Sequence, residues 1–326
     1  MQTQLTQAQT EVSTGQVADI GLTLGASTGQ FVSLTQQLSG LQTITDTNNL
    51  VSTRLSATNS AMSDILSTAQ GFLKDLVTDQ NDTTDPALMQ QQAMTSLQSL
   101  ISDLDTTADQ QYVFAGINSD VKPLQDYSGS TAQQAVASAF STAFGTTQSG
   151  AGAANVSPSD MQTFLGSTQF SDLFTGSGWT TNWSSASSQP IRSRITSTEL
   201  TDTSVTANDP SIQSIVKAYT MVADLGLSNL SQGTQQTVLS AAANTLTQAI
   251  TGFTNLQASL GTMQSQVTSA NNQMSVQVNV LTTQINNLDS VDPYEASTKV
   301  NDLTTQIETA YALTQQLRGL SLVNYL

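Results

Sequence analysis

Apolar residues recur at every seventh position through the C-terminal part of the chain. The row starts at Leu239 and runs for eight members without a polar interruption. A second row, from Ala242 to Ala270, is three to four residues out of step with it and completes a seam. This spacing is typical of a long helix that packs along another helix. The members of the first row are Leu239, Leu246, Phe253, Leu260, Val267, Met274, Leu281 and Leu288.

A comparable pattern near the N-terminus predicts a second rod, with Asn48 as the polar member of its row. A polar residue in such a seam either fixes the register of the helices at a cost in stability or is simply tolerated. Ordering the backbone costs about 1–2 kcal/mol per residue, so we expect that the C-terminal rod is not stable alone. It should pack on the N-terminal rods or on neighbouring subunits. The apolar members of the N-terminal row are Leu34, Leu41, Leu55, Met62, Ala69 and Leu76.

Three Asp-Pro pairs mark changes of element. Asp85-Pro86 and Asp209-Pro210 predict helix starts, because Asp caps a helix and Pro suits its first turn. Asp292-Pro293 predicts a break in the C-terminal rod. An amphipathic terminal assembly helix is predicted after this break, and an apolar tail follows it. The apolar face of that helix includes Val300, Leu303, Ile307 and Leu317.

The segment 118–209 has no heptad pattern and is rich in Gly, Ser, Thr and aromatic residues. Short helices are predicted at 132–144 and 159–165, and alternation over 179–205 predicts strands with a hairpin near Pro190. The predicted fold is mainly α, a long antiparallel helical bundle of coiled-coil rods from both chain ends with a small inserted α+β domain. The predicted segments are N-terminal rods 1–117, the insert 118–209, a C-terminal rod 210–291, and a linker with the terminal assembly helix 292–326.

Composition narrows the chemistry. The 326 residues include no Cys and no His, and the formal net charge is −16. Thiolate ligands, disulfides and the commonest general base are therefore excluded, and we expect no enzyme activity, no cofactor and no metal. The acidic charge argues against nucleic-acid binding. No apolar run is long enough to span a bilayer, so no membrane insertion is expected, and the polar start of the sequence does not resemble a secretory signal.

Two acidic patterns have both a functional and a structural interpretation. Residues 79–85 (Asp-x-Asn-x-Thr-x-Asp) resemble the start of a calcium-binding loop, but Thr84 and Gln90 stand where that loop needs Gly and Glu. We interpret the segment as an acidic loop before a helix. Asp103 and Asp105 lie two apart on a predicted helix and do not face one another as a catalytic pair would, so we interpret them as solvated surface charges.

Two pairs in the insert have the spacing of neighbours on one strand face. Trp179 and Trp183 would share such a face, where they could stack on a sugar or, as we favour, belong to the core. Arg192 and Arg194 would also share a face. They could contact an acidic neighbouring subunit, although a solvated strand face is the simpler interpretation.

Three stretches carry a recognisable pattern. Residues 11–22 contain Glu-Val-Ser-Thr-Gly and Ala-Asp-Ile-Gly-Leu, residues 111–116 read Gln-Tyr-Val-Phe-Ala-Gly, and the chain closes with residues 292–297 and a Ser-Leu-Val-Asn-Tyr-Leu ending. Together they resemble the bacterial flagellin superfamily, and within it the hook-filament junction proteins. The likeness covers roughly 1–117 and 210–326. The junction signature, tyrosine-x-phenylalanine-x-glycine, corresponds to Tyr112, Phe114 and Gly116.

The resemblance implies an extracellular structural subunit of the flagellum, exported through the flagellar type III apparatus, that joins hook to filament. Its implied partners are sister copies in a homo-oligomer ring, the other hook-associated junction protein, flagellin, and an export chaperone on the C-terminal helix. Family members usually have a further segment before the residues that begin here, so 294–326 is expected to be disordered in isolation. Main-filament flagellin and a surface glycan-binding adhesin on a flagellin-like frame stay open as alternatives.

Overall fold

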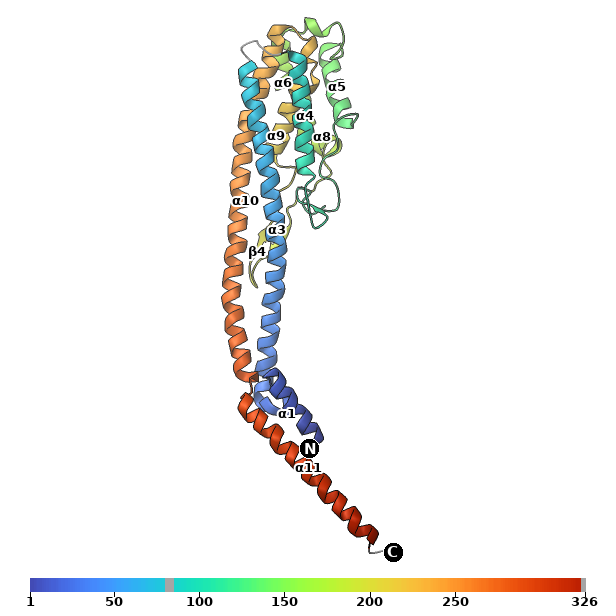
Figure 1. Cartoon of the computed structure of the whole chain (residues 1–326). Helices are drawn as coiled ribbons and strands as arrows, with labels where there is room; N and C mark the ends of the chain where they lie inside the picture. The colour runs from blue at the N-terminus through green and yellow to red at the C-terminus, as the bar shows by residue number, and fades with distance from the viewer. Residues whose placement is uncertain (80–84, 324–326) are drawn as a thin grey trace. The chain divides into compact units, whose positions relative to one another are not determined.

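The computed structural model describes residues 1–79 and 85–323, and most of them are helical (Figure 1). The chain forms two compact units. Unit 1 comprises residues 1–45 and those from 272 on, and unit 2 comprises residues 46–271. The prediction of a mainly α fold, with long helical rods from both chain ends and a small insert, is confirmed. The predicted segment limits at 117, 209 and 291 stay predictions.

Unit 2 contains most of the two longest helices, α3 (Thr28–Asp79) and α10 (Gln232–Asp289). Side-chain contacts establish that the two helices are antiparallel here. Asn48 is hydrogen-bonded to Asn271, whereas Ser63, further along α3, bonds to Gln257, which comes earlier in α10. Figure 1 shows the two helices side by side. Their facing apolar rows form the long side of the unit 2 core.

Two shorter helices complete this bundle, α4 (Pro86–Leu104) and α9 (Pro210–Asp224), and they pack along one another. Both begin as predicted. The Asp85 carboxylate accepts a hydrogen bond from the Ala87 amide at 2.9 Å, and the residue before Pro210 caps α9 in the same way. Tyr219 of α9 meets the ring of Phe72 of α3 edge-on, with centroids 5.3 Å apart. The 3-10 turn η4 (Leu227–Asn229) then leads into α10.

The insert is built from short helices. They are α5 (Thr131–Phe144), α6 (Pro158–Gly166), α7 (Thr168–Ser171) and α8 (Gly176–Asn182), with 3-10 turns η2 (Ala153–Asn155) and η3 (Asp172–Phe174). The predicted helices at 132–144 and 159–165 are therefore confirmed. A chain of ring contacts joins these helices through Phe144, Phe140, Phe164, Phe170, Phe174, Trp183 and Trp179. The buried residues of the insert belong to the same hydrophobic cluster as those of α3, α4, α9 and α10.

The predicted strand at 179–183 is wrong, because this segment is helical. Trp179 lies in α8 and Trp183 is its C-cap. Residues four apart share a helix face as readily as residues two apart share a strand face, and here burial of both indoles selects the helix. The predicted hairpin exists but is shifted. It is formed by β3 (Arg192–Arg194) and β4 (Leu200–Asp202), with its turn at 195–199, and Pro190 precedes it.

A second, smaller hairpin follows α4. Strands β1 (Thr107–Ala108) and β2 (Gln111–Tyr112) are antiparallel, with Ala108 opposite Gln111. The two turn residues Asp109 and Gln110 both have positive φ, at 51° and 64°. This is the conformation that a two-residue hairpin with the right-handed strand twist requires.

Unit 1 pairs α1 (Gln2–Thr14) with α11 (Pro293–Val323) in antiparallel fashion. The Gln2 side chain donates to the Tyr311 hydroxyl at 2.9 Å, and Lys299 lies 3.6 Å from Glu11. The break predicted at Asp292-Pro293 is confirmed, since α10 ends just before it and α11 begins at the proline. The short helix α2 (Ile20–Leu24) and the turn η1 (Gly25–Ser27) lead from α1 toward α3.

Candidate functional site

The predicted heptad rows are most tightly buried in unit 2. There, Leu246, Phe253 and Leu260 are fully buried on α10, as are Leu55 and Met62 on α3. Toward the chain ends burial declines. Val267, Met274 and Leu34 are still buried, whereas Leu41, Leu281 and Leu288 are half-buried; Leu239, near the start of α10, is buried. The rows therefore build the core of the rods, and a role for them between subunits stays a prediction.

Asn48 is fully buried within the seam between α3 and α10. Its side-chain amide donates to Asn271 Oδ1 at 2.9 Å and to the carbonyl oxygen of Ile195 at 2.8 Å. Ile195 follows β3 directly and is itself fully buried. A single polar group thus connects both rods and the hairpin of the insert. This contact favours the register interpretation of Asn48 over simple tolerance.

The signature segment 111–116 acts as an anchor inside unit 2. Tyr112 is half-buried on β2, and Phe114 is fully buried. Gly116 has φ +61°, and a Cβ there would lie 2.5 Å from the carbonyl oxygen of Gln189 and 2.7 Å from that of Ser187. Glycine is thus required twice, for its backbone conformation and for the close approach of the 187–189 backbone.

The pairing of α1 with α11 carries a buried acidic group that the sequence pattern did not reveal. Glu11 is only 8 % exposed, and it accepts a hydrogen bond from the Ala18 amide besides its ion pair with Lys299. Nearby, the Val17 amide donates to the Asp289 carbonyl and the Val291 amide to the Gly15 carbonyl. These bonds join the connection after α1 to the connection before α11. The only sequence signal was an acid–base pair on two segments far apart in the chain.

The terminal helix α11 is covered along one stretch only. Val300, Leu303 and Ile307 are half-buried, whereas residues 311–318 are all exposed, Leu317 at 67 %. Most of the exposed large apolar side chains in the described part of the chain lie in unit 1, although it is the smaller unit. They are Met1, Val12, Leu22, Val32, Val276, Val280, Tyr294, Tyr311, Leu313 and Leu317. An accumulation of exposed apolar side chains marks an interaction surface.

Asp103 and Asp105 are not the solvated charges that the sequence suggested. Both are half-buried, because α4 packs against α9 at this end. Burial and the nearby Asp64 raise the pKa of Asp103 to about 6. Burial also raises the pKa of Asp105, although Lys122 lies 3.0 Å away and opposes the change. Asp105 is paired with Lys122, whereas the charge that acts on Asp103 is that of Asp64, so the two carboxylates do not form a catalytic pair.

The two tryptophans do not form an exposed stacking platform. Each is 1 % exposed, and their rings stack at 5.8 Å in the core. The Trp179 indole donates to Asn208 Oδ1 at 2.8 Å. Arg192 and Arg194 do share an exposed strand face, where Arg192 pairs with Asp202 of the neighbouring strand at 3.2 Å. A contact of these arginines with another subunit stays a prediction.

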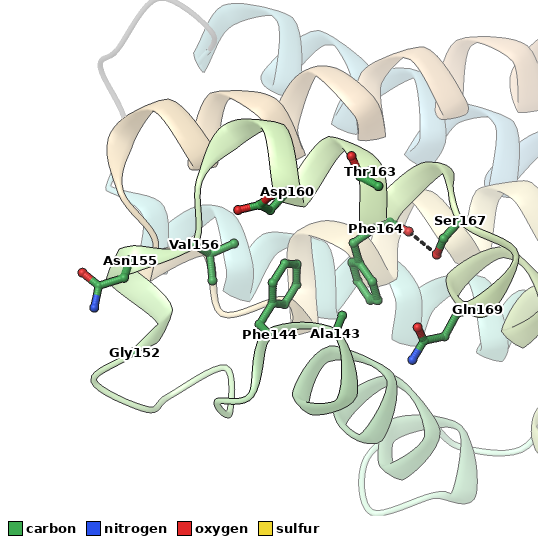
Figure 2. A pocket seen from close by; sticks show the side chains of 10 residues that line it. All are labelled: Ala143, Phe144, Gly152, Asn155, Val156, Asp160, Thr163, Phe164, Ser167 and Gln169. Carbon is green, nitrogen blue, oxygen red and sulfur yellow. Dashed lines mark hydrogen bonds between the residues drawn. The ribbon is translucent and has the colours of Figure 1, made fainter.

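An open pocket of about 460 Å³ lies between the C-terminal end of α5 and α6. Figure 2 shows that its floor is formed by the rings of Phe144 and Phe164, whose centroids are 5.2 Å apart. Asp160 at its rim accepts a hydrogen bond from the Ser157 hydroxyl and so takes part in capping α6. These residues serve packing and capping, and they offer no acid–base pair for catalysis.

Neither metal binding nor membrane insertion has support in the described residues. No group of three or more acidic side chains in 1–79 and 85–323 is arranged to hold a metal ion. No helix within the same residues is long and apolar enough to cross a membrane. The acidic loop compared with a calcium site, residues 79–85, falls largely outside the described part of the chain.

Comparison with known proteins identifies the rods. The bacterial flagellin N-terminal helical region matches residues 1–119, and the bacterial flagellin C-terminal helical region matches residues 243–326. No curated protein sequence matches the chain. A solved structure from Vibrio parahaemolyticus, described as a flagellar hook-associated protein, has the same fold. Its TM-score is 0.57 at 11 % sequence identity, and the alignment covers 81 % of this chain and 97 % of that one. With both rods matched by flagellin family models over more than half of its length, the chain belongs to the flagellin superfamily, whose members are structural subunits of the flagellum.

Proposed function

We propose that this chain is the adaptor that joins the flagellar hook to the filament, a junction protein of the hook-associated protein 3 type. The observation that carries a structural role is the apolar surface of unit 1. Leu313 and Leu317 of α11 are 54 % and 67 % exposed, on a helix whose earlier turns pack against α1. Burying such side chains releases about 25 cal/mol for each Å² of apolar area. Neighbouring subunits would bury them.

The junction role is favoured over the main filament by two observations. The segment 111–116 has the tyrosine-x-phenylalanine-x-glycine pattern, with Gly116 in the conformation and contact that require glycine. The solved structure described as a flagellar hook-associated protein is matched over nearly its whole length. Main-filament flagellin is the second candidate, because its rods would have the same pattern.

The implied partners follow from this role. Sister copies would form a ring, the other hook-associated junction protein would lie below it, and flagellin above. An export chaperone would cover α11 before secretion through the type III apparatus, which would keep its apolar residues from self-associating. The half-buried Val300, Leu303 and Ile307 would contact the chaperone only if α1 is displaced, whereas Leu317 is available throughout.

Deletion of the chain in its host tests the function. Imaging of the hooks and an assay for soluble flagellin in the medium are both needed. Bare hooks with flagellin released to the medium are expected for a junction adaptor, because export continues without a seat for polymerisation. Bare hooks without flagellin anywhere would identify the filament subunit instead. Intact filaments would contradict both roles and favour an adhesin on a flagellin-like frame.

A matched pair of variants tests the assembly surface. Leu317→Asp places a charge on the exposed apolar part of α11, and Gln315→Asp places the same charge two residues away on an exposed polar position. Both should fold with unchanged helicity. Only Leu317→Asp should fail to restore filaments in the deletion strain. Equal restoration by the two variants would show that this face of α11 is not an assembly surface.

A further inference from the structure

A pocket of about 530 Å³ opens on unit 2 where α6, α9 and α10 meet. Lys217 of α9 lines it, together with a polar stripe on α10. The stripe comprises Gln236, Ser240 and Asn244, four residues apart along the helix. This spacing places the three side chains in one row on a single face.

Lys217 is a half-buried cation without a carboxylate partner. Its ammonium group donates to the Ser171 hydroxyl at 3.1 Å and lies 5.5 Å from the centre of the Phe170 ring. No acidic side chain lines the pocket, and no ion pair to Lys217 exists within residues 1–79 and 85–323. Burial lowers the pKa of Lys217, and no neighbouring charge opposes this change.

This situation is unusual in a chain with 24 acidic and only eight basic residues. Lys122 binds two carboxylates, at 3.0 and 2.9 Å, and Lys299 and Arg192 each have an acidic partner. Lys74, by contrast, is exposed to water. Arg54 is also half-buried and has no ion pair among the described residues, but the charge of Asp109 acts on it, whereas no acidic charge acts on Lys217 in its pocket. A half-buried charge of this kind is stabilised when an anion binds beside it.

The rest of the lining indicates what accompanies that anion. The side chains of Gln162, Gln236, Ser240 and Asn244 line the pocket and form no hydrogen bond with another described residue. They offer donors and acceptors for several hydroxyl groups. The volume of the pocket lies in the range of small-molecule sites. A single Asp or Glu side chain from another protein would fill only a small part of this volume and would contact few of these polar groups.

We propose that Lys217 and the polar stripe of α10 form a binding site for an acidic sugar of the uronic acid type. Lys217 binds the carboxylate, and the amides and hydroxyls bind the sugar hydroxyls. The pocket is open, so the sugar enters either free or as the end residue of a glycan. This site is independent of the role of the chain in the flagellum.

The test uses the purified full chain and saturation-transfer NMR with calorimetry. Glucuronate and galacturonate should bind saturably, and glucose should bind about tenfold more weakly or worse because it lacks the charge-assisted contact. Lys217→Met should weaken glucuronate binding by about tenfold or more, and Lys217→Arg should weaken it less. Lys74→Met removes the same charge from an exposed site and should change nothing. Thermal unfolding of each variant checks that it is folded.

Three results would overturn the proposal. They are the absence of saturable uronate binding, equal binding by the Lys217→Met variant, and equal affinity for acetate and glucuronate. A loss of self-association in Lys217→Met with no uronate binding by the parent chain would instead assign Lys217 to an acidic group of a second copy. Oligogalacturonate distinguishes the two sources of sugar. If oligogalacturonate binds as tightly, for each of its end residues, as galacturonate does, the ligand can be the end of a glycan. If only the monosaccharide binds, the ligand is a free sugar.

Discussion

The side chain of Asn48 donates a hydrogen bond to Asn271 across the two long helices α3 and α10, at 2.9 Å. The same amide also donates to the Ile195 carbonyl, while the Asn48 side-chain oxygen is buried with no partner among the described residues. A leucine would bury more apolar area at this position. The contact therefore selects one register of the rods and one position of the hairpin, rather than the greatest stability.

Replacing Asn48 with Ala should lower the free energy of unfolding by about 1–3 kcal/mol, because the Ile195 carbonyl and Asn271 lose their buried donor. Ser52→Ala, on an exposed position of the same helix, is the control and should have little effect. Urea unfolding measures both. A double-mutant cycle with Asn271→Ala should give a coupling of about 0.5 kcal/mol or more. Strict additivity would mean that the two residues do not interact.

Leu260 is fully buried in the heptad row of α10, and its truncation should be costly. Leu260→Ala should reduce the free energy of unfolding by about 2–5 kcal/mol, the range for a cavity in a rigid core. Leu256, one turn earlier and half-buried, is the matched control and should lose distinctly less. Guanidinium unfolding monitored by helicity compares the two variants. Similar losses would contradict the assignment of the row that contains Leu260 to the centre of the rods.

Gly116 should not tolerate any side chain. Gly116→Ala combines a positive φ with a Cβ 2.5 Å from the Gln189 carbonyl oxygen. Gly129 has a similar φ of +75°, but nothing lies within 4 Å of its Cβ position. Gly129→Ala should cost only the backbone strain, about 1–2 kcal/mol, and Gly116→Ala should cost more. Equal melting temperatures for the two variants would rule out the close approach as a constraint.

Stability should fall with rising pH through the titration of Asp103. Its pKa is raised to about 6 in the folded chain, by burial first and by Asp64 second, and Tyr219 of α9 is the other titratable group that it influences. A raised carboxyl pKa means that the folded state holds this proton more tightly than the unfolded state does. The resulting contribution to stability is fully present below about pH 4 and is lost as the pH rises through 6. Asp103→Asn should therefore stabilise the chain at pH 8 and have little effect near pH 4.

Denaturant titrations at both pH values measure this difference. The exposed Asp120→Asn variant carries the same change in charge and controls for the overall net charge of −16. A stabilisation by Asp103→Asn that is the same at pH 4 and pH 8 would exclude the ionised carboxylate as its cause.

The sequence was sufficient to predict the rods because their signal is local and repeated. A heptad that persists from Leu239 to Leu288 has few alternatives to a long helix, and the Asp-Pro pairs locate the helix starts within a residue. The decline in burial at Leu281 and Leu288 could not be predicted, because a heptad specifies which face is apolar and not what covers it.

The insert was harder to predict because its contacts are distant in sequence. Trp179 and Trp183 have a spacing that fits both a strand and a helix, and only their burial in the core decides between them. The need for Gly116 arises from the 187–189 backbone, some seventy residues later. The stripe that includes Ser240 looks like an ordinary solvated face in the sequence, and only the packing of α6 and α9 places Lys217 in the same pocket.

The single hydrophobic cluster of unit 2 bears on how such a chain can be altered. Residues of the insert such as Phe140 and Trp183 share that cluster with the rod residues Leu55 and Leu246. Deleting residues 118–209, or replacing them with another protein, would expose to water the apolar side chains of α4 and α9 that the insert now covers. Foreign peptides displayed on this scaffold should instead be inserted at residues 197–199, the exposed part of the hairpin turn, whose side chains lie outside the core.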